Sequence, residues 1–159
     1  MLPKIDFELL TIFFSGGTGK SNIKKTYINK IMKYFKIKKG LWKGYRLWDL
    51  YNDAKTPYHW HKKLFLYAKK IGIKIFSTPF DDTAVDFLEK LNCPIYKIAS
   101  FEMTDLNLIR KVSKTKKPLI ISTGMANLKE IETTVKTAKR NGAKDITLLY
   151  CVSNYPSSI

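Results

Sequence analysis

The chain is predicted to fold as an α/β protein in which one parallel sheet is built from about four consecutive βα units. Four short apolar runs, at residues 73–76, 95–99, 118–122 and 146–151, begin about 22 to 28 residues apart, which is the usual period of such units. Amphipathic helical stretches lie between the runs. Small polar or charged residues end or follow each run, and the C-terminal strand ends of a parallel sheet are where ligands bind.

The length of the chain limits whether the sheet can close into a barrel. The 159 residues allow one domain with a core, whereas a closed eight-stranded barrel takes about 250 residues. Right-handed crossovers would place the four strands side by side, as in half of a (β/α)8 barrel. The alternative is an open doubly wound sheet, but no Gly-x-Gly-x-x-Gly turn follows any of the four runs.

The helix predicted over residues 56–71 has recognisable ends. Thr56, which precedes a proline, is the expected N-cap, and Gly72 is well placed to end the helix. Residues 73–76 are β-branched and aromatic and are predicted as the first strand, followed by a helix over residues 82–91.

Two further helices are predicted, over residues 104–113 and 127–140. Thr104 is the expected cap of the first. The second has acidic residues early, basic residues at its end and Gly142 just beyond it, as the helix dipole and the C-cap favour. The strands at 95–99, 118–122 and 146–151 flank these helices.

Composition excludes several classes of protein. No apolar run approaches the roughly 20 residues that span a bilayer, and acidic Asp6 and Glu8 before the apolar residues 9–14 argue against a signal peptide. Cys93 and Cys151 do not make a disulfide framework, and both lie in or beside apolar runs, where a buried free thiol is usual. We therefore expect a cytoplasmic protein that has no membrane partner.

The net charge of +16 raises a basic nucleic-acid-binding module as an alternative function. Residues 20–39 hold eight lysines and no acidic residue. The excess is almost all lysine in a chain rich in Ile, Asn, Tyr and Phe, and an AT-rich genome produces the same usage. We therefore do not expect nucleic acid as a partner. The run at residues 15–21, SGGTGKS, resembles a phosphate loop, but Phe14 stands where the first glycine belongs, which favours a simple turn.

Four motifs give the clearest indication of function. They are FSTPFD at residues 76–81, YKIASFE at 96–102, ISTGM at 121–125, and a last strand that ends in Tyr155-Pro156. In this order and spacing they closely resemble the sialic acid synthase family, whose members join phosphoenolpyruvate to an amino sugar. The segments GLWKG, LWDLY and the Trp-His pair within residues 40–61 look most like pseudaminic acid synthases, with the neuraminic or legionaminic branch as the alternative.

The resemblance implies a fold and a division of the chain. The family fold is a (β/α)8 TIM barrel followed by a small antifreeze-like domain. We expect residues 34–159 to form part of that barrel, without the family's first and last strands and without its C-terminal domain. Residues 1–33 are expected to be an atypical lysine-rich segment. A frameshifted or truncated gene would produce this pattern.

The resemblance also implies a reaction. The enol carbon of phosphoenolpyruvate attacks the open-chain aldehyde of a 2,4-diacetamido-2,4,6-trideoxy-altrose, which a divalent metal (Mn²⁺ or Mg²⁺) polarises; water then adds and phosphate leaves. The family's metal-binding histidines have no counterpart here, so no metal ligand is assigned and the chain alone is expected to be inactive. Homodimers occur in the family, so a second copy is a further expected partner.

The phosphate-binding residues implied by the resemblance are Lys97, Ser100 and Ser122, with Thr78 as a strand-end hydroxyl in the substrate site. A lysine between apolar strand residues is costly unless its ammonium reaches a partner, which a phosphate would supply. The alternatives are a lysine that extends to solvent from a strand end and hydroxyls that only form turns.

Glu102 is the candidate catalytic residue, because it could contact the sugar or handle a proton; the alternative is a solvated loop carboxylate. Ser153 and Tyr155 are expected to contact substrate. His59 and His61 have the spacing of a metal-binding pair, but residues two apart on a helix point to different faces, so a structural role is expected.

Overall fold

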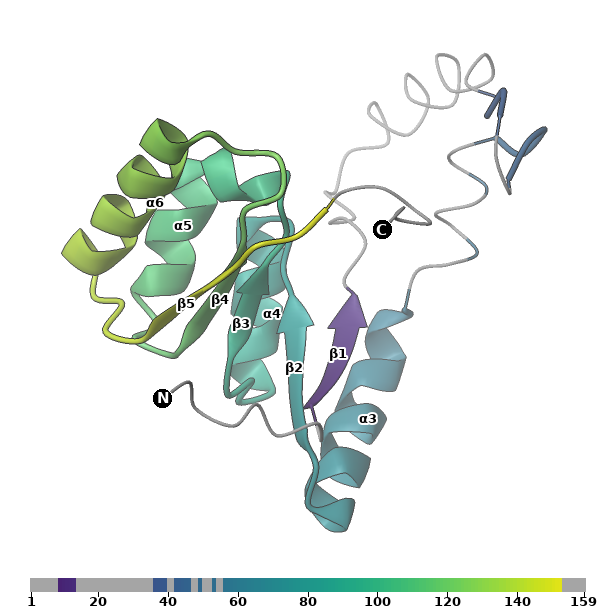
Figure 1. The fold of residues 1–159 in the computed structure, drawn as a ribbon. Helices are drawn as coiled ribbons and strands as arrows, with labels where there is room; N and C mark the ends of the chain where they lie inside the picture. The colour runs from purple at the N-terminus through teal and green to yellow at the C-terminus, as the bar shows by residue number, and fades with distance from the viewer. Residues whose placement is uncertain are drawn as a thin grey trace.

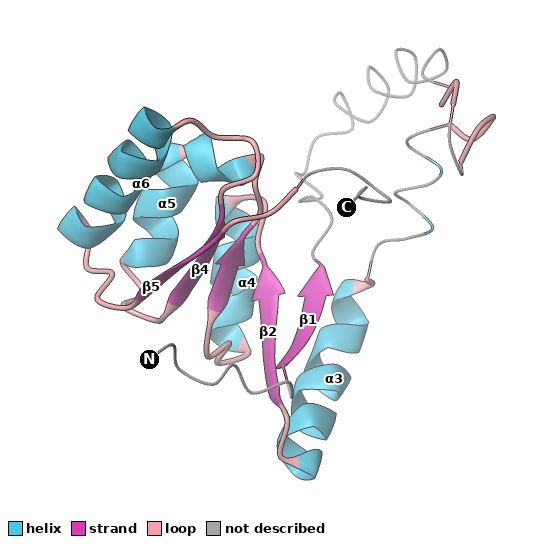
Figure 2. Ribbon diagram, in the orientation of Figure 1, coloured by secondary structure: helices cyan, strands magenta, loops and turns pink. Residues whose placement is uncertain are grey.

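The computed structural model describes residues 9–13, 36–39, 42–46, 49, 53 and 56–152. Its centre is a single parallel sheet with strand order β1-β2-β3-β4-β5 (Figures 1 and 2). The strands are β1 (Leu9–Phe13), β2 (Lys74–Thr78), β3 (Tyr96–Ile98), β4 (Leu119–Ser122) and β5 (Ile146–Leu149). The helices are α3 (Tyr58–Ile71), α4 (Asp82–Lys90), the 3-10 helix η1 (Glu102–Thr104), α5 (Leu106–Ser113) and α6 (Leu128–Arg140).

The strand order confirms the predicted fold class. Every strand pairs in parallel with the next one along the chain, so the order never reverses as it would in a doubly wound sheet. Crossovers of one hand then place all connecting helices on the same side of the sheet. The arrangement is that of consecutive βα units from a (β/α)8 barrel.

The sheet has one strand more than predicted. Residues 9–13 form β1, which pairs with β2 from Leu9↔Lys74 to Phe13↔Thr78. From the sequence, the apolar residues 9–14 were weighed only as a possible signal peptide. The register of β1 makes it the edge strand beside β2, and the predicted division of the chain at residue 33 stays a prediction.

The main core lies on one face of the sheet. Tyr96 and Ile98 of β3 are adjacent in register to Leu119 and Ile121 of β4, and all four are almost completely buried. They belong to one apolar cluster with residues from every long helix: Phe65 and Ala68, Ala84, Val85 and Leu88, Leu108, Ile109 and Val112, and Ala138. Because strand side chains alternate, the next residue on each strand faces the opposite side.

The helix ends correct two predicted caps. The N-cap of α3 is Pro57 rather than Thr56, and it makes no side-chain capping hydrogen bond. The cap of α5 is Asp105 rather than Thr104, because Asp105 Oδ1 accepts from the N–H groups of Asn107 (3.0 Å) and Leu108 (3.1 Å). Thr104 instead ends η1, whose 3-10 turn sets the path of the chain after β3.

One predicted helix end is confirmed, and α6 (Leu128–Arg140) begins at a cap that was not predicted. Gly72 ends α3 in the left-handed conformation with φ +77°, which favours glycine because it has no Cβ. Asn127 caps α6 in a capping box: its side chain accepts from the Glu130 N–H (3.0 Å), and the Glu130 carboxylate accepts from the Asn127 N–H (2.8 Å).

A polar cluster ties the N-terminal end of β3 to α4. The Tyr96 hydroxyl donates to Glu89 Oε1 at 2.6 Å, and Lys117 Nζ pairs with the same oxygen at 2.5 Å. The Lys117 ammonium also lies 5.8 Å from the centre of the Tyr96 ring. This cluster is at the end of the sheet opposite the strand ends that hold the candidate site, where polar contacts serve stability.

None of the helices in the described segments has the length and hydrophobicity needed to cross a membrane.

Candidate functional site

The predicted site residues on the strands share one face of the sheet. Lys97 of β3 is adjacent in register to Ile120 of β4, and Ser122 lies two residues further along β4. Thr78 follows Ser77, the register partner of Tyr96, and therefore lies beside Lys97. Alternation places Thr78, Lys97 and Ser122 on the face opposite the main core, at the C-terminal strand ends.

Thr78 is the last residue of β2 and is completely buried. Its Oγ1 has no hydrogen-bond partner within the part of the chain that the structure describes. A buried hydroxyl without a partner costs free energy, on the order of 1–3 kcal/mol. A ligand oxygen at this edge of the sheet would offset that cost.

Lys97 and Glu102 influence one another across the strand end. Burial lowers the pKa of the Lys97 ammonium, and the negative charges of Cys151 and Glu102 oppose that shift. Burial raises the pKa of the Glu102 carboxyl, and the Lys97 charge opposes that shift. Each charge therefore lowers the desolvation cost of the other.

Glu102 is the first residue of η1, directly after the loop that carries Ser100. Its Oε2 is buried and accepts no hydrogen bond from the described residues. A carboxyl with a raised pKa close to a lysine can give or take a proton more easily than one in water. This placement fits the predicted role of a proton-handling or sugar-contacting group.

Ser100 and Ser122 come together around a residue that was not predicted for the site. Ser100 Oγ lies 3.2 Å from Cys151 Sγ, and the Ser122 hydroxyl and the Gly124 N–H help to hold the pKa of that thiol below its ordinary value. The expectation that Cys151 is a buried core thiol is wrong, because its side chain is only partly buried and faces the strand-end side. The sequence could have indicated this placement, because Cys151 ends the fourth apolar run, at residues 146–151, and the ends of these runs hold the other site residues.

Cys93, by contrast, is the buried free thiol that was expected. Its side chain is completely buried in the core cluster, and its Sγ donates to the Ile95 carbonyl at 3.1 Å. Burial raises the pKa of this thiol. The two cysteines of the chain therefore lie in opposite environments.

The other predicted positions divide into two groups. Ser153 and Tyr155 lie outside the described residues, so their roles stay predictions. His59 is exposed, whereas His61 is completely buried, with Nδ1 3.1 Å from the Pro57 carbonyl and its ring edge-on to Phe87 at 5.5 Å. The two rings thus lie on different sides of α3, as the structural interpretation expected.

The divalent metal implied by the resemblance has no donor set in the described segments, where no three His, Cys, Asp or Glu side chains gather as ligands would.

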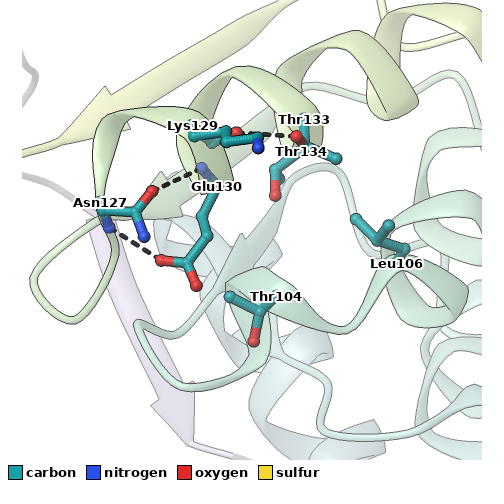
Figure 3. Close-up of a pocket in the computed structure, with 7 residues that line it drawn as sticks. All are labelled: Thr104, Leu106, Asn127, Lys129, Glu130, Thr133 and Thr134. Carbon is teal, nitrogen blue, oxygen red and sulfur yellow. Dashed lines mark hydrogen bonds between the residues drawn. The ribbon is translucent and has the colours of Figure 1, made fainter.

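A pocket lies among the helices rather than at the strand ends. It measures about 440 Å³ and is bordered by Thr104, Leu106, Asn127, Lys129, Glu130, Thr133 and Thr134 (Figure 3). Its polar groups make hydrogen bonds within the fold: Thr134 Oγ1 donates to the Met103 carbonyl at 2.9 Å, and Asn127 and Glu130 cap α6. None of the predicted site residues lines it.

Comparison with known proteins gives a consistent result. The chain matches a family model described as the NeuB family over residues 20–159. It is 49% identical over 125 residues to a pseudaminic acid synthase of Helicobacter pylori, an alignment that covers 79% of this chain and 37% of the relative. It is 50% identical over 99 residues to an N,N'-diacetyllegionaminic acid synthase of Campylobacter jejuni, covering 61% of this chain and 30% of the relative.

Solved structures are similar over most of the chain. An N-acetylneuraminic acid (sialic acid) synthetase from Leptospira borgpetersenii, in complex with citrate, superposes with a TM-score of 0.68 and 25% identity. The superposition covers 94% of this chain and 45% of that one. The chain therefore spans less than half the length of the relatives that it matches.

Proposed function

Because the chain belongs to the NeuB family, we propose that it carries the phosphoenolpyruvate-binding part of a pseudaminic acid synthase-type active site. The observation that supports this proposal is the shared strand-end face of one ammonium and two hydroxyls, those of Lys97, Ser100 and Ser122. Phosphate oxygens accept charge-assisted hydrogen bonds from such groups, each worth about 1.5–3 kcal/mol. Half-burial of Lys97 strengthens its attraction for an anion.

The proposed reaction condenses phosphoenolpyruvate with 2,4-diacetamido-2,4,6-trideoxy-altrose. The C3 carbon of phosphoenolpyruvate forms a bond to the aldehyde carbon of the open-chain sugar, whose oxygen takes a proton. Water adds to the cationic C2 that results and loses a proton; the bond between C2 and the phosphate oxygen then breaks, inorganic phosphate leaves, and the new C2 hydroxyl gives up its proton to form the ketone. In this proposal Lys97, Ser100 and Ser122 bind the phosphate, and Thr78 donates to a substrate oxygen.

Glu102 is proposed to handle a proton in this sequence. Its raised pKa keeps a larger protonated fraction near neutral pH than an ordinary glutamate has, and the Lys97 ammonium lies close enough to influence it. A carboxyl in this state can supply the proton that the aldehyde oxygen takes and recover it from the attacking water. Ser153 and Tyr155 are proposed to contact the substrate from the segment that follows β5.

The identity of the sugar rests on the relatives. The alignment to the pseudaminic acid synthase extends over 125 residues, against 99 for the legionaminic acid synthase of similar identity. The longer match supports the pseudaminic branch. The second candidate is an N-acetylneuraminate or legionaminate synthase-type site, which would use the same phosphate-binding groups with a different amino sugar.

Calorimetric titration of the full chain with phosphoenolpyruvate tests the phosphate site. Lys97→Met should weaken binding by about ten- to one hundred-fold, because it removes a charge-assisted contact of about 1.5–3 kcal/mol. Lys136→Met is the matched control: it removes the same charge from an exposed ion pair with Glu132 on α6. Circular dichroism of both variants verifies the fold. Equal affinity of Lys97→Met and the unchanged chain would refute the proposal.

Turnover is tested separately from binding. The purified chain is incubated with phosphoenolpyruvate, Mn²⁺ and the diacetamido-altrose, and phosphate release is measured against parallel reactions with the legionaminic and neuraminic precursors. We expect residues 1–159 alone to release no phosphate. Phosphate release with the diacetamido-altrose, and not with the other two sugars, would instead show that the chain is a working pseudaminic acid synthase.

A further inference from the structure

The sulfur of Cys151 is a point of convergence for hydrogen-bond donors at the candidate site. Ser100 Oγ, from the loop after β3, lies 3.2 Å from Sγ. The Ser122 hydroxyl from the end of β4, which shares a face with Cys151, and the Gly124 N–H from the following turn also help to lower the pKa of this thiol. Donors from separate segments that point at one acceptor create a place suited to an anion.

We propose that the thiolate of Cys151 and the phosphate group of the substrate compete for the same hydroxyl donors, those of Ser100 and Ser122. This inference rests on the proposed function, in which those two serines bind phosphate. A serine hydroxyl has a single hydrogen, so a hydroxyl that donates to the sulfur cannot donate to a phosphate oxygen at the same time. Phosphate binding therefore removes these donors from the sulfur, which destabilises the thiolate and lowers the fraction of Cys151 in the reactive form.

An independent observation indicates that this face of the sheet takes a ligand. Thr78 Oγ1 is completely buried and lacks a hydrogen-bond partner in the described part of the chain. The register places Thr78 beside Lys97, on the same face as Ser122. A polar ligand that spans this face would meet the Thr78 hydroxyl at one end and the donors around Cys151 at the other.

The charged groups around Cys151 favour a negative charge on its sulfur. Lys97 from β3 interacts electrostatically with the thiol, and Glu102 from η1 is coupled to the same lysine. The hydrogen bond from Ser100 is the largest cause that holds the pKa of the Cys151 thiol below its ordinary value. Stabilisation of the thiolate makes Cys151 a better nucleophile than an ordinary cysteine at neutral pH.

The chain carries its own control for a test of this thiol. Cys93 is completely buried, and burial raises its pKa. Iodoacetamide should therefore modify Cys151 quickly and Cys93 slowly in the folded chain. In that reaction the Cys151 sulfur attacks the CH₂ carbon, a C–S bond forms, the C–I bond breaks and iodide leaves, while the thiol proton passes to solvent.

The experiment measures the alkylation rate of Cys151 by peptide mass spectrometry at pH 7.5, with and without ligand. Competition predicts that phosphoenolpyruvate at ten times its Kd slows alkylation about tenfold, and that inorganic phosphate also protects at concentrations above its own Kd. Pyruvate, which has the carboxylate but no phosphate, should leave the rate unchanged. Ser100→Ala should slow alkylation without any ligand, because the thiolate loses a donor. Cys93→Ser should change neither result.

The outcomes separate this inference from the proposed function. If calorimetry shows that phosphoenolpyruvate binds but alkylation is unaffected, or if pyruvate protects equally well, the competition is refuted while the phosphate site stands. If phosphoenolpyruvate does not bind at all, the proposed function fails and the competition fails with it. Protection by phosphoenolpyruvate and inorganic phosphate, but not by pyruvate, supports both.

Discussion

Replacement of Tyr96 by phenylalanine should destabilise the fold by removing one hydrogen bond and almost nothing else. The Tyr96 ring is completely buried in the core, and phenylalanine retains that ring. Only the hydroxyl is lost, together with its 2.6 Å hydrogen bond to Glu89 Oε1. The loss therefore isolates the contribution of the polar cluster at the N-terminal end of β3.

The size of the effect follows from the surroundings of Glu89. A hydrogen bond to a charged group contributes about 1.5–3 kcal/mol when it is buried. The Glu89 side chain is 38% exposed and keeps Lys117 on the same oxygen, so its carboxylate can recover part of the lost interaction from water. We therefore expect a loss near the lower limit, about 1.5 kcal/mol, which corresponds to a fall in Tm of roughly 3–6 °C for a chain of this length.

Urea unfolding followed by circular dichroism measures this loss. Glu132→Gln is the control, because it breaks the exposed ion pair with Lys136 on α6 and should cost less than about 0.5 kcal/mol. A double-mutant cycle with Glu89→Ala, which removes the acceptor, should give a coupling energy close to the loss caused by Tyr96→Phe alone. A loss below about 0.5 kcal/mol for Tyr96→Phe, or no coupling to Glu89, would refute the reasoning.

Two further predictions concern residues outside the site. Burial lowers the pKa of His61, so the folded state favours the neutral ring, and stability should fall as the pH drops below about 6.5. Urea unfolding at pH 7.5 and 5.5 should show a smaller pH-dependent loss for His61→Asn than for the unchanged chain or for His59→Asn; equal losses would contradict this. Asp105→Ala should destabilise the chain by about 1 kcal/mol through loss of the α5 cap, whereas Thr104→Ala should have little effect. A larger loss of stability for Thr104→Ala than for Asp105→Ala would instead indicate that Thr104 is the cap.

The order of the elements could be predicted because the apolar runs are regular. The runs at residues 95–99 and 118–122 contain β3 and β4, and each observed strand is one or two residues shorter than its run. Strand β1 was missed because residues 9–13 have no βα spacing to the next run: α3 begins only at Tyr58. Only pairing with β2 identifies this segment as part of the sheet.

The caps illustrate where local chemistry is ambiguous. Thr104 and Asp105 are neighbouring residues of the kinds that cap helices, and the sequence cannot decide between them. The 3-10 turn η1 decides, because it uses Thr104 as its last residue and leaves Asp105 to accept from the start of α5.

The candidate site also contains residues whose placement could be predicted from the sequence and one whose placement could not. The placement of Lys97, Ser100 and Ser122 at the strand ends could be predicted because each belongs to a motif that contains or follows an apolar run, whereas their role in binding phosphate stays a prediction. The position of Cys151 could not, because an apolar run with a cysteine predicts a core thiol, and the side on which it lies depends on the register of β5 with β4. That register places Leu149 beside Ser122 and so brings the residue two further along to the same face.

A crystal structure of the chain with bound phosphoenolpyruvate tests the central claim most directly. The account predicts that the phosphate lies within about 3 Å of Lys97 Nζ and of the Ser100 and Ser122 hydroxyls, with Ser100 Oγ turned away from Cys151 Sγ. A phosphate bound elsewhere, for instance in the pocket beside the first turn of α6, with the Ser100–Cys151 contact intact, would contradict the account.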